Sequence, residues 1–372
     1  MRTKPMKVAV VMLLVFATLL TTFAPLAQAQ TPTVAPTPTS ASMEPTPVPR
    51  PALTPVATGK KPADVKVAVV AGGPHPYFRP MEPASADVKK DLGLGDVQYK
   101  VPQDWNLNTS NQLINSLVAQ GFNAFTSWPA DPVASNGTFD ELVAKGIPVI
   151  SMAACINQPT KVDFCLSTDV AQSAYLATKA LIKAMGGKGK IMHGTGYLID
   201  LNSQKRMAAV KKAVDETNGA VTLYQTLADI DDQEKADKAI NSFMAAHAND
   251  IDGIVTTAYV PSVVSATALR NLGDKRIKMI GIDDDPVVLD AIKDGFIDGT
   301  MSQNPYGQAY IGATVLSDLV AGCVPKQDAP FHIDSGTLLI TKDNVATYDN
   351  ERKALTKEIA TGFKDKYLVC PK

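Results

Sequence analysis

The sequence predicts an α/β protein of two doubly wound, Rossmann-like lobes, each with a parallel sheet covered by helices on both faces. Strand-like and helix-like runs alternate from residue 65 to residue 340, as they do in chains of β-α-β units. Several strand-like runs, such as 67–70, are wholly apolar, which is typical of strands buried on both faces. About 310 residues follow residue 62, and a chain of that length exceeds a single hydrophobic core.

The first half of this region alternates regularly. We expect strands at 67–70, 97–101, 124–126, 148–152 and 164–167. We expect helices at 81–92, 109–120, 139–145 and 169–185. In the second of these helices, Ile114, Leu117 and Val118 recur at helical spacing and define an apolar face. Gly186 and Gly187 mark the end of the last helix, because glycine readily adopts the left-handed conformation found there.

The second half repeats the pattern. We expect strands at 190–193, 221–226, 253–257, 277–282, 299–303 and 337–340. We expect helices at 203–217, 233–247, 262–272 and 306–320. In the first of these, Met207, Val210 and Val214 form an apolar stripe. A further helix begins at Asp285 and Pro286, since an acidic N-cap followed by proline is a common helix start.

The N-terminus predicts export. Residues 1–29 have a basic start, an apolar run at 8–20 and the small-residue cleavage pattern Ala27-Gln28-Ala29, as in a secretory signal peptide. No cysteine follows the signal before Cys155, which argues against a lipid anchor. Residues 30–62 are rich in proline and threonine, and we expect a disordered linker there. The protein is therefore expected in the periplasm or on the outer face of the cell membrane.

Charge and histidine spacing exclude several classes of protein. Removal of the three basic signal residues leaves 33 Lys and Arg, from 36, against 37 Asp and Glu. This mild acidity argues against nucleic acid or an anionic membrane as the main partner. No C-x-x-C motif occurs and the four histidines are far apart in sequence, so we expect no metal site.

The four cysteines are candidates for two disulfides, as in other exported chains, and the first pair is favoured while pairing of the second stays open. Cys155 and Cys165 bracket a short loop, and Cys323 and Cys370 would pin the C-terminal tail to the end of a helix. The alternative for the first pair is two buried free thiols.

Aromatic residues follow several expected strands, at the edge of a parallel sheet where ligands bind. Tyr77 and Phe78 come after the first strand and its Gly72-Gly73 turn. Both rings could instead belong to the core. Trp128 follows the third strand, where it could stack on a ligand or cover the edge of the lobe. Tyr259 follows a strand of the second half and carries a weaker form of the same signal.

Six segments carry a resemblance to a known family. They are HPYF (75–78), GIPVIS (146–151), SQKR (203–206), ALRNLG (268–273), GIDDDP (281–286) and TMSQNP (300–305). With these segments in this order and spacing, the chain from about 65 to 340 resembles the type I periplasmic sugar-binding proteins, the ribose-binding-like group that serves ABC transporters.

The resemblance implies two lobes joined by a three-segment hinge, with the ligand trapped between them. The first lobe would comprise 63–168 and 304–332, and the second lobe 169–303 and 333–372. In the same way, Asp283 would accept hydrogen bonds from sugar hydroxyls and Arg206 would donate to them. Gln303 would lie at the hinge and the cleft.

The first lobe would contribute Tyr77 and Phe78 as paired aromatics, with His75 where the family often has asparagine. His75 could donate to a hydroxyl or hold the loop. The chain departs from the family at Ala153 and Ala154, which stand in place of an Asp-Arg pair that grips the sugar. Another departure is Ile230, at a position where an aromatic is common.

Local alternatives remain for the charged residues. Arg206 could be a surface residue of its helix. For the three consecutive aspartates, we assign ligand binding to Asp283, a solvated position to Asp284 and helix capping to Asp285.

We therefore expect a monomeric binding protein without cofactor or catalytic residues, which captures a monosaccharide or polyol and delivers it to a membrane permease. Alternatives are a binder of a non-sugar solute and a sensing domain for a membrane receptor. An enzyme is disfavoured because no G-x-G-x-x-G opens a helix after the first strand and no G-x-S-x-G occurs. A sugar-responsive regulator would need an N-terminal helix-turn-helix, where this chain has a signal peptide and a linker.

Overall fold

The structure is a computed structural model that describes residues 50–371. The expected signal peptide (1–29), the first part of the expected linker (30–49) and residue 372 lie outside the described residues. Within the described part of the chain, no helix has both the length and the apolar character needed to cross a membrane.

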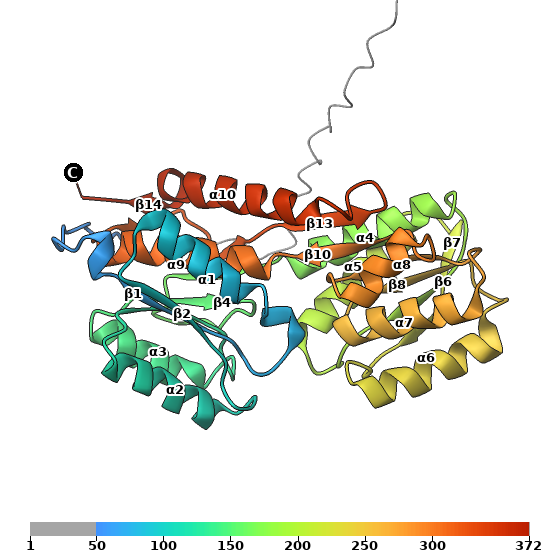
Figure 1. Cartoon of the computed structure of the whole chain (residues 1–372), viewed down its shortest axis with the longest axis horizontal. Coiled ribbons are helices and arrows are strands. Elements are labelled where there is room, and N and C mark those ends of the chain that lie inside the picture. The colour runs from blue at the N-terminus through green and yellow to red at the C-terminus, as the bar shows by residue number, and fades with distance from the viewer. Residues whose placement is uncertain (1–49, 372) are drawn as a thin grey trace, which may run out of the picture. The chain divides into compact units, whose positions relative to one another are not determined.

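The first lobe is built on six parallel strands in the order β12-β5-β4-β3-β1-β2. These are β1 (Lys66–Val70), β2 (Asp96–Lys100), β3 (Ala124–Ser127), β4 (Val149–Met152), β5 (Phe164–Ser167) and β12 (His332–Asp334). Helices α1 (Met81–Leu92) and α9 (Pro305–Val320) cover one face of the sheet (Figure 1). Helices α2 (Leu107–Ala119) and α3 (Ser135–Ala144) cover the other.

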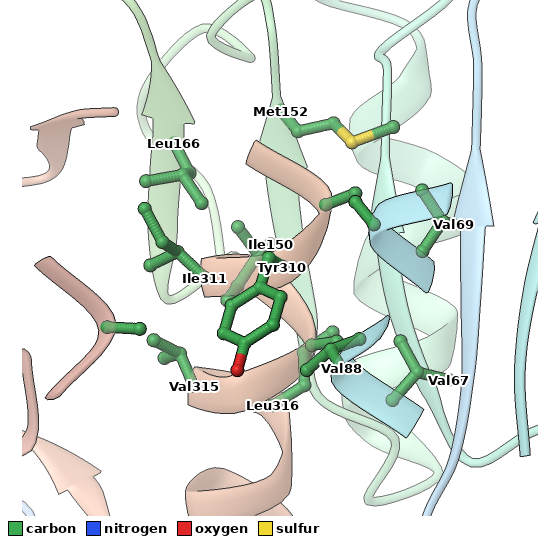
Figure 2. Close-up of a cluster of buried hydrophobic side chains, with 14 of the residues drawn as sticks. Val67, Val69, Val88, Ile150, Met152, Leu166, Tyr310, Ile311, Val315 and Leu316 are labelled. Carbon is green, nitrogen blue, oxygen red and sulfur yellow. The ribbon is translucent and has the colours of Figure 1, made fainter. Parts of the chain in front are cut away.

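Strand β1 shows why this sheet needs apolar residues on both faces. Val67 and Val69 point into the cluster formed with α1 and α9, and Ala68 and Val70 point into the cluster formed with α2 and α3. All four side chains are fully buried. Figure 2 shows residues of β1, β4, β5, α1 and α9 meeting in the first of these clusters. The period of two along a strand thus places alternate residues in two different cores.

The second lobe has six strands in the order β13-β10-β9-β8-β6-β7, and only β13 is antiparallel to its neighbour. The strands are β6 (Gly189–Gly194), β7 (Val221–Leu227), β8 (Gly253–Thr256), β9 (Lys278–Ile282), β10 (Gly299–Gln303) and β13 (Thr337–Thr341). The helices are α4 (Val170–Ala184), α5 (Leu201–Asp215), α6 (Gln233–His247), α7 (Tyr259–Leu272) and α8 (Pro286–Lys293). Helices α4 and α5 pack on one face of the sheet, and α6, α7 and α8 pack on the other.

Three segments join the lobes, at 167–169, 303–304 and 334–337. Asn304 connects the three segments. Its side-chain Nδ2 donates to the Ser335 carbonyl at 2.7 Å, and its backbone N–H donates to Thr168 Oγ1 at 3.4 Å. The expected fold class, two doubly wound lobes with a three-segment hinge, is confirmed.

The C-terminal stretch differs from the expectation that 333–372 belongs to the second lobe. After β13 the chain forms α10 (Tyr348–Tyr367), which packs along α9 (Figure 1). Ala360 and Phe363 of α10 are buried in the core of the first lobe. Strand β14 (Leu368–Val369) then pairs with β11 (Val324–Pro325) beyond α9. The end of the chain therefore returns to the first lobe.

The last part of the expected disordered linker is also placed differently. The Arg50 guanidinium donates to the Ala329 carbonyl at 3.2 Å, and Thr58 Oγ1 donates to the Val320 carbonyl at 2.7 Å. These bonds attach the described end of the expected disordered linker, residues 50–62, to the first lobe. Sequence composition missed them because they join residues more than 260 positions apart.

Both expected cysteine pairs form disulfides, Cys155 with Cys165 and Cys323 with Cys370. The second fastens the end of the chain to the residues that follow α9, so β11, β14 and the disulfide together hold the tail.

We predict that loss of the Cys323–Cys370 disulfide destabilises the protein more than loss of Cys155–Cys165. The bonded residues are 47 positions apart in the first case and 10 in the second. Loop-closure entropy then gives about 4 against about 3 kcal/mol. Urea unfolding of the two paired Cys→Ser variants measures the order. A larger loss for the Cys155→Ser, Cys165→Ser variant would contradict this account.

Candidate functional site

The first wall of the candidate site is the turn after β1. His75 Nδ1 accepts the Tyr77 amide proton at 3.1 Å, which starts a short helical turn at Pro76–Phe78. Since Nδ1 accepts, Nε2 carries the proton of the neutral ring. The Tyr77 hydroxyl donates a hydrogen bond to Gln308 Oε1 at 3.0 Å. Burial raises the pKa of this hydroxyl. Phe78 is fully buried and belongs to the core of the first lobe, so its expected role as a ligand-facing ring is not supported.

Two tryptophans lie over the Gly72-Gly73 turn. A Cβ atom at Gly72 would come within 2.7 Å of both Trp105 and Trp128, and one at Gly73 would come within 2.7 Å of Trp105. Only glycine lets the rings approach the backbone this closely. The two indole centroids are 5.9 Å apart at 79°, an edge-to-face arrangement. Phe78 supports both rings from below, at 6.0 and 5.7 Å.

Trp105 is a candidate site residue that sequence reasoning missed. Its side chain is 49% exposed, whereas Trp128 is partly buried against the core. Trp105 follows the carboxyl end of β2 in the same way that Trp128 follows β3. The signal used for Trp128, an aromatic residue at the carboxyl end of a strand, could have found Trp105 as well.

The second lobe brings Arg206, Asp283 and Gln303 together from α5, the end of β9 and the end of β10. Gln303 joins them, since its Nε2 donates to Asp283 Oδ1 at 2.9 Å and its Oε1 accepts from Arg206 at 3.4 Å. Asp283 and Gln303 are buried. Arg206 Nε is buried without a hydrogen-bond partner in the described structure, so it remains a donor for a bound molecule.

Asp283 is electrostatically unusual. Burial raises the pKa of its carboxyl to about 7, although the hydrogen bond from Gln303 and the charge of Arg206 act in the opposite direction. Its backbone is left-handed, with φ +66°. This conformation is held by a bond from its amide to the Met301 carbonyl at 3.0 Å and one from Thr300 Oγ1 to its own carbonyl at 2.7 Å.

The three consecutive aspartates have three different partners. Asp285 caps α8 by accepting the Val287 amide proton at 2.8 Å, as expected. Asp284 is not a solvated residue, because it accepts from Arg352 at 2.8 Å and from the Tyr348 hydroxyl at 3.2 Å. The expectation failed because both partners lie more than 60 residues away on α10.

Two candidate residues from opposite lobes touch. The His75 ring and the Tyr259 ring are 5.2 Å apart in an edge-to-face contact. Tyr259 is the first residue of α7, and its hydroxyl donates to Asp285 Oδ2 at 2.7 Å. Burial lowers the pKa of His75, while the charge of Asp231 opposes this shift.

The site is chemically asymmetric. Its first-lobe wall consists of Tyr77, Trp105 and Trp128, and its second-lobe wall carries the charged and amide groups. The contact between His75 and Tyr259 joins the two lobes, and the charges of Asp283 and Arg206 act on the pKa of the Tyr77 hydroxyl in opposite directions. Ala153 and Ala154 offer no side-chain hydrogen bond, and Ile230 is buried in the core of the second lobe.

Two cavities lie next to these residues rather than on them. One of about 420 Å³ lies at the hinge and is bordered by Ala154 and Cys155 of the first lobe and Asn202 and Lys205 of the second. Another of about 620 Å³ lies between α5 and β7 and includes none of the expected site residues.

The described residues contain one group with metal-ligand spacing, Asp318 with Cys323 and Cys370. Both of these cysteines are engaged in a disulfide and offer no thiolate for a metal.

We predict that Asp283→Asn stabilises the ligand-free protein at pH 8 but not at pH 4. Because the pKa of Asp283 is raised by folding, its proton stabilises the folded state below about pH 4, and this contribution is lost as the pH rises through about 7. The uncharged amide avoids that loss, which is about 4 kcal/mol. Calorimetric melting of the wild type and the variant at both pH values measures the change in stability.

The control is Asp284→Asn, which should be destabilising at pH 8 because Arg352 loses a charged partner. An Asp283→Asn variant with the same gain at both pH values would show that this carboxyl is not buried in solution.

Residues 67–323 match the family described as the periplasmic binding protein domain. The chain is 26% identical over 249 residues to a xylitol-binding protein of Mycolicibacterium smegmatis, covering 65% of this chain and 69% of that protein. It is 23% identical over 248 residues to a D-apiose import binding protein of Paraburkholderia graminis, covering 66% and 78%.

Solved structures agree in fold. An ABC transporter solute-binding protein from Burkholderia graminis, in complex with D-arabinose, has a TM-score of 0.66 and 24% identity, with 78% of this chain and 99% of that one covered. The resemblance noted in the sequence is thereby confirmed. The chain belongs to the periplasmic binding protein family.

Proposed function

We propose that this protein captures a monosaccharide or polyol between its two lobes, outside the cytoplasm, and delivers it to the permease of an ABC transporter. The observation that carries the proposal is the hydrogen-bonded chain Arg206–Gln303–Asp283 of the second lobe. The aromatic residues Trp105 and Trp128 of the first lobe support it. Its relatives, named for binding xylitol and D-apiose, support this ligand class.

The chemistry of a sugar fits this pair of walls. Hydroxyl groups form a polar rim, and C–H groups form apolar faces that stack on aromatic rings. Hydrogen bonds that involve a charged partner contribute about 1.5–3 kcal/mol each. Asp283 can accept two hydroxyl protons, and the unpartnered Nε of Arg206 can donate to a ring or hydroxyl oxygen.

The asymmetry also defines how the ligand would lie. The charged and amide groups Arg206, Asp283 and Gln303 all come from the second lobe, so the ligand would turn its hydroxyl-rich edge toward that lobe. Its C–H face would lie on Trp105, Trp128 and Tyr77. Ala153 and Ala154 would leave the remaining edge of the ligand without a side-chain bond from the first lobe.

The partner and the oligomeric state follow from the same proposal. A monomer with a ligand between its lobes presents a different surface when the lobes close, and a permease can recognise that change. The three hinge segments at 167–169, 303–304 and 334–337 are short, which is compatible with hinge closure.

We predict that at least one pentose, hexose or polyol raises the melting temperature of the purified protein. Ligand at 100 times its Kd adds about 2.7 kcal/mol of stability to the folded state. A thermal-shift screen that includes xylitol, D-ribose, D-arabinose and D-glucose measures this directly. A flat response to the whole panel would overturn the ligand class.

We also predict that Arg206→Ala abolishes binding of the best ligand and leaves the fold intact. The matched control is Lys211→Ala on the same helix, whose side chain is exposed and pairs with Asp215 at 2.6 Å. Isothermal titration calorimetry compares the two variants. Equal affinities for both would place the ligand elsewhere.

A further inference from the structure

The turn between β9 and α8 is held by three different elements. Asp283 is bonded by Gln303 of β10, and Asp285 caps α8 and accepts from Tyr259 of α7. The middle residue, Asp284, is held by α10 through Arg352 and Tyr348. Helix α10 lies beyond residues 67–323, the part of the chain that matches the family. A segment outside the family match thus touches the residue next to the candidate ligand-binding aspartate.

Helix α10 contacts both lobes and the hinge. Near its start, Tyr348 packs against a core cluster of the second lobe, and near its end Phe363 is buried in the core of the first lobe. Between them, Thr356 Oγ1 accepts a bond from Asn304 of the hinge at 3.0 Å. A helix of 20 residues is about 30 Å long and behaves as a stiff rod. Figure 1 shows it passing from above α9 toward β13.

The far end of the rod is fixed. Strand β14, which directly follows α10, pairs with β11 of the first lobe. Cys370 is then bonded to Cys323. The near end of α10 is held against the second lobe, because Val345 is buried in the core of that lobe and Asn344 Nδ2 donates to the Leu339 carbonyl of β13 at 3.1 Å.

Arg352 makes the near-end contact. Its side chain is only 8% exposed, and it pairs with Asp284 at 2.8 Å, while a second guanidinium nitrogen pairs with Asp349. Removing a buried charge from such a pair leaves its partner uncompensated, which is costly. The pair therefore restrains the position of Asp284 strongly.

The restraint matters because Asp283 has a left-handed backbone, with φ +66°. A residue other than glycine keeps such a conformation only where its surroundings determine it. Asp284 is its immediate neighbour, so the Arg352 contact is one of the interactions that keep the Asp283 carboxylate aimed at the site.

We propose that Arg352 is a positioning residue for ligand binding. It holds the 283–285 turn of the second lobe through its ion pair with Asp284. The role in ligand binding rests on the proposed function, whereas the hold on the turn does not.

The pKa of Asp283 distinguishes a positioning role of Arg352 from a role in stability alone. The charged and polar groups that act on Asp283 are Gln303, Arg206, Asp284 and Asp231. Asp284 raises the pKa of Asp283, and Arg352 neutralises Asp284. Without Arg352 the pKa of Asp283 rises further, and binding that needs the ionised carboxylate fails at a higher pH on acidification.

The test compares Arg352→Met with Lys353→Met. Lys353 is the next residue of α10 and pairs with Asp349 at 3.4 Å, but no bond joins it to the 283–285 turn. In the ligand-free protein, hydrogen exchange of peptides that cover 281–288 should be about tenfold faster in Arg352→Met and within twofold of wild type in Lys353→Met. Equal exchange in both variants would overturn the proposal. This arm needs no sugar, so its outcome is independent of the proposed function.

The second arm measures the affinity for xylitol and D-ribose between pH 5 and pH 8. Arg352→Met should bind about tenfold more weakly at pH 7, and the pH at which its binding falls to half should be higher than in wild type. Arg352→Lys, which keeps the charge, should recover most of both effects. A uniform loss with an unchanged pH profile and no rescue by lysine would show a merely structural role. Absence of sugar binding by the wild type would count against the proposed function alone.

Discussion

The candidate site depends most on the burial of the Asp283 carboxyl beside Gln303 and Arg206. A carboxyl removed from water favours its protonated form, and its pKa of about 7 reflects this. Gln303 and Arg206 reduce the cost of burying the carboxylate without removing it. The hydrogen bond from Gln303 comes from an uncharged side-chain amide, and Arg206 donates to Gln303 rather than to Asp283 itself. The free protein thus holds an incompletely satisfied acceptor beside an incompletely satisfied donor. A ligand with adjacent hydroxyl groups would complete both.

The aromatic wall of the first lobe depends on close packing of its rings. Gly72 and Gly73 have no side chains, and this lets Trp105 and Trp128 lie against the backbone with Phe78 beneath them. The rings are therefore supported before any ligand arrives, and little conformational entropy is lost when one binds. The polar wall would orient a bound molecule through hydrogen bonds, and the aromatic wall would provide apolar contact area. Neither wall alone would select a small polyhydroxylated molecule.

Much of this arrangement could be predicted from the sequence because the fold follows local patterns. Alternating apolar runs and helix signals such as Asp285-Pro286 identified the strands and helices of both lobes. The resemblance to a family indicated Arg206, Asp283 and Gln303, which the structure brings together. The aromatic residues were found only in part, since Trp105 was overlooked and Phe78 belongs to the core.

The remaining features depend on contacts between distant residues. Helix α10 has a polar, charged sequence, and its role becomes visible only where Arg352 meets Asp284 and Phe363 enters the first lobe. Arg50 likewise looked like part of a disordered linker until its bond to Ala329 placed it. Such pairs leave no local pattern in the sequence, because each partner taken alone is compatible with an exposed surface residue.

A crystal structure of the protein with the sugar or polyol that stabilises it most would test the central claim directly. The account predicts the ligand between the lobes, with hydroxyl oxygens within hydrogen-bond distance of Asp283 and Arg206 and a C–H face on Trp105 or Trp128. A ligand bound in the cavity between α5 and β7, or one that leaves Asp283 and Arg206 without contact, would contradict it.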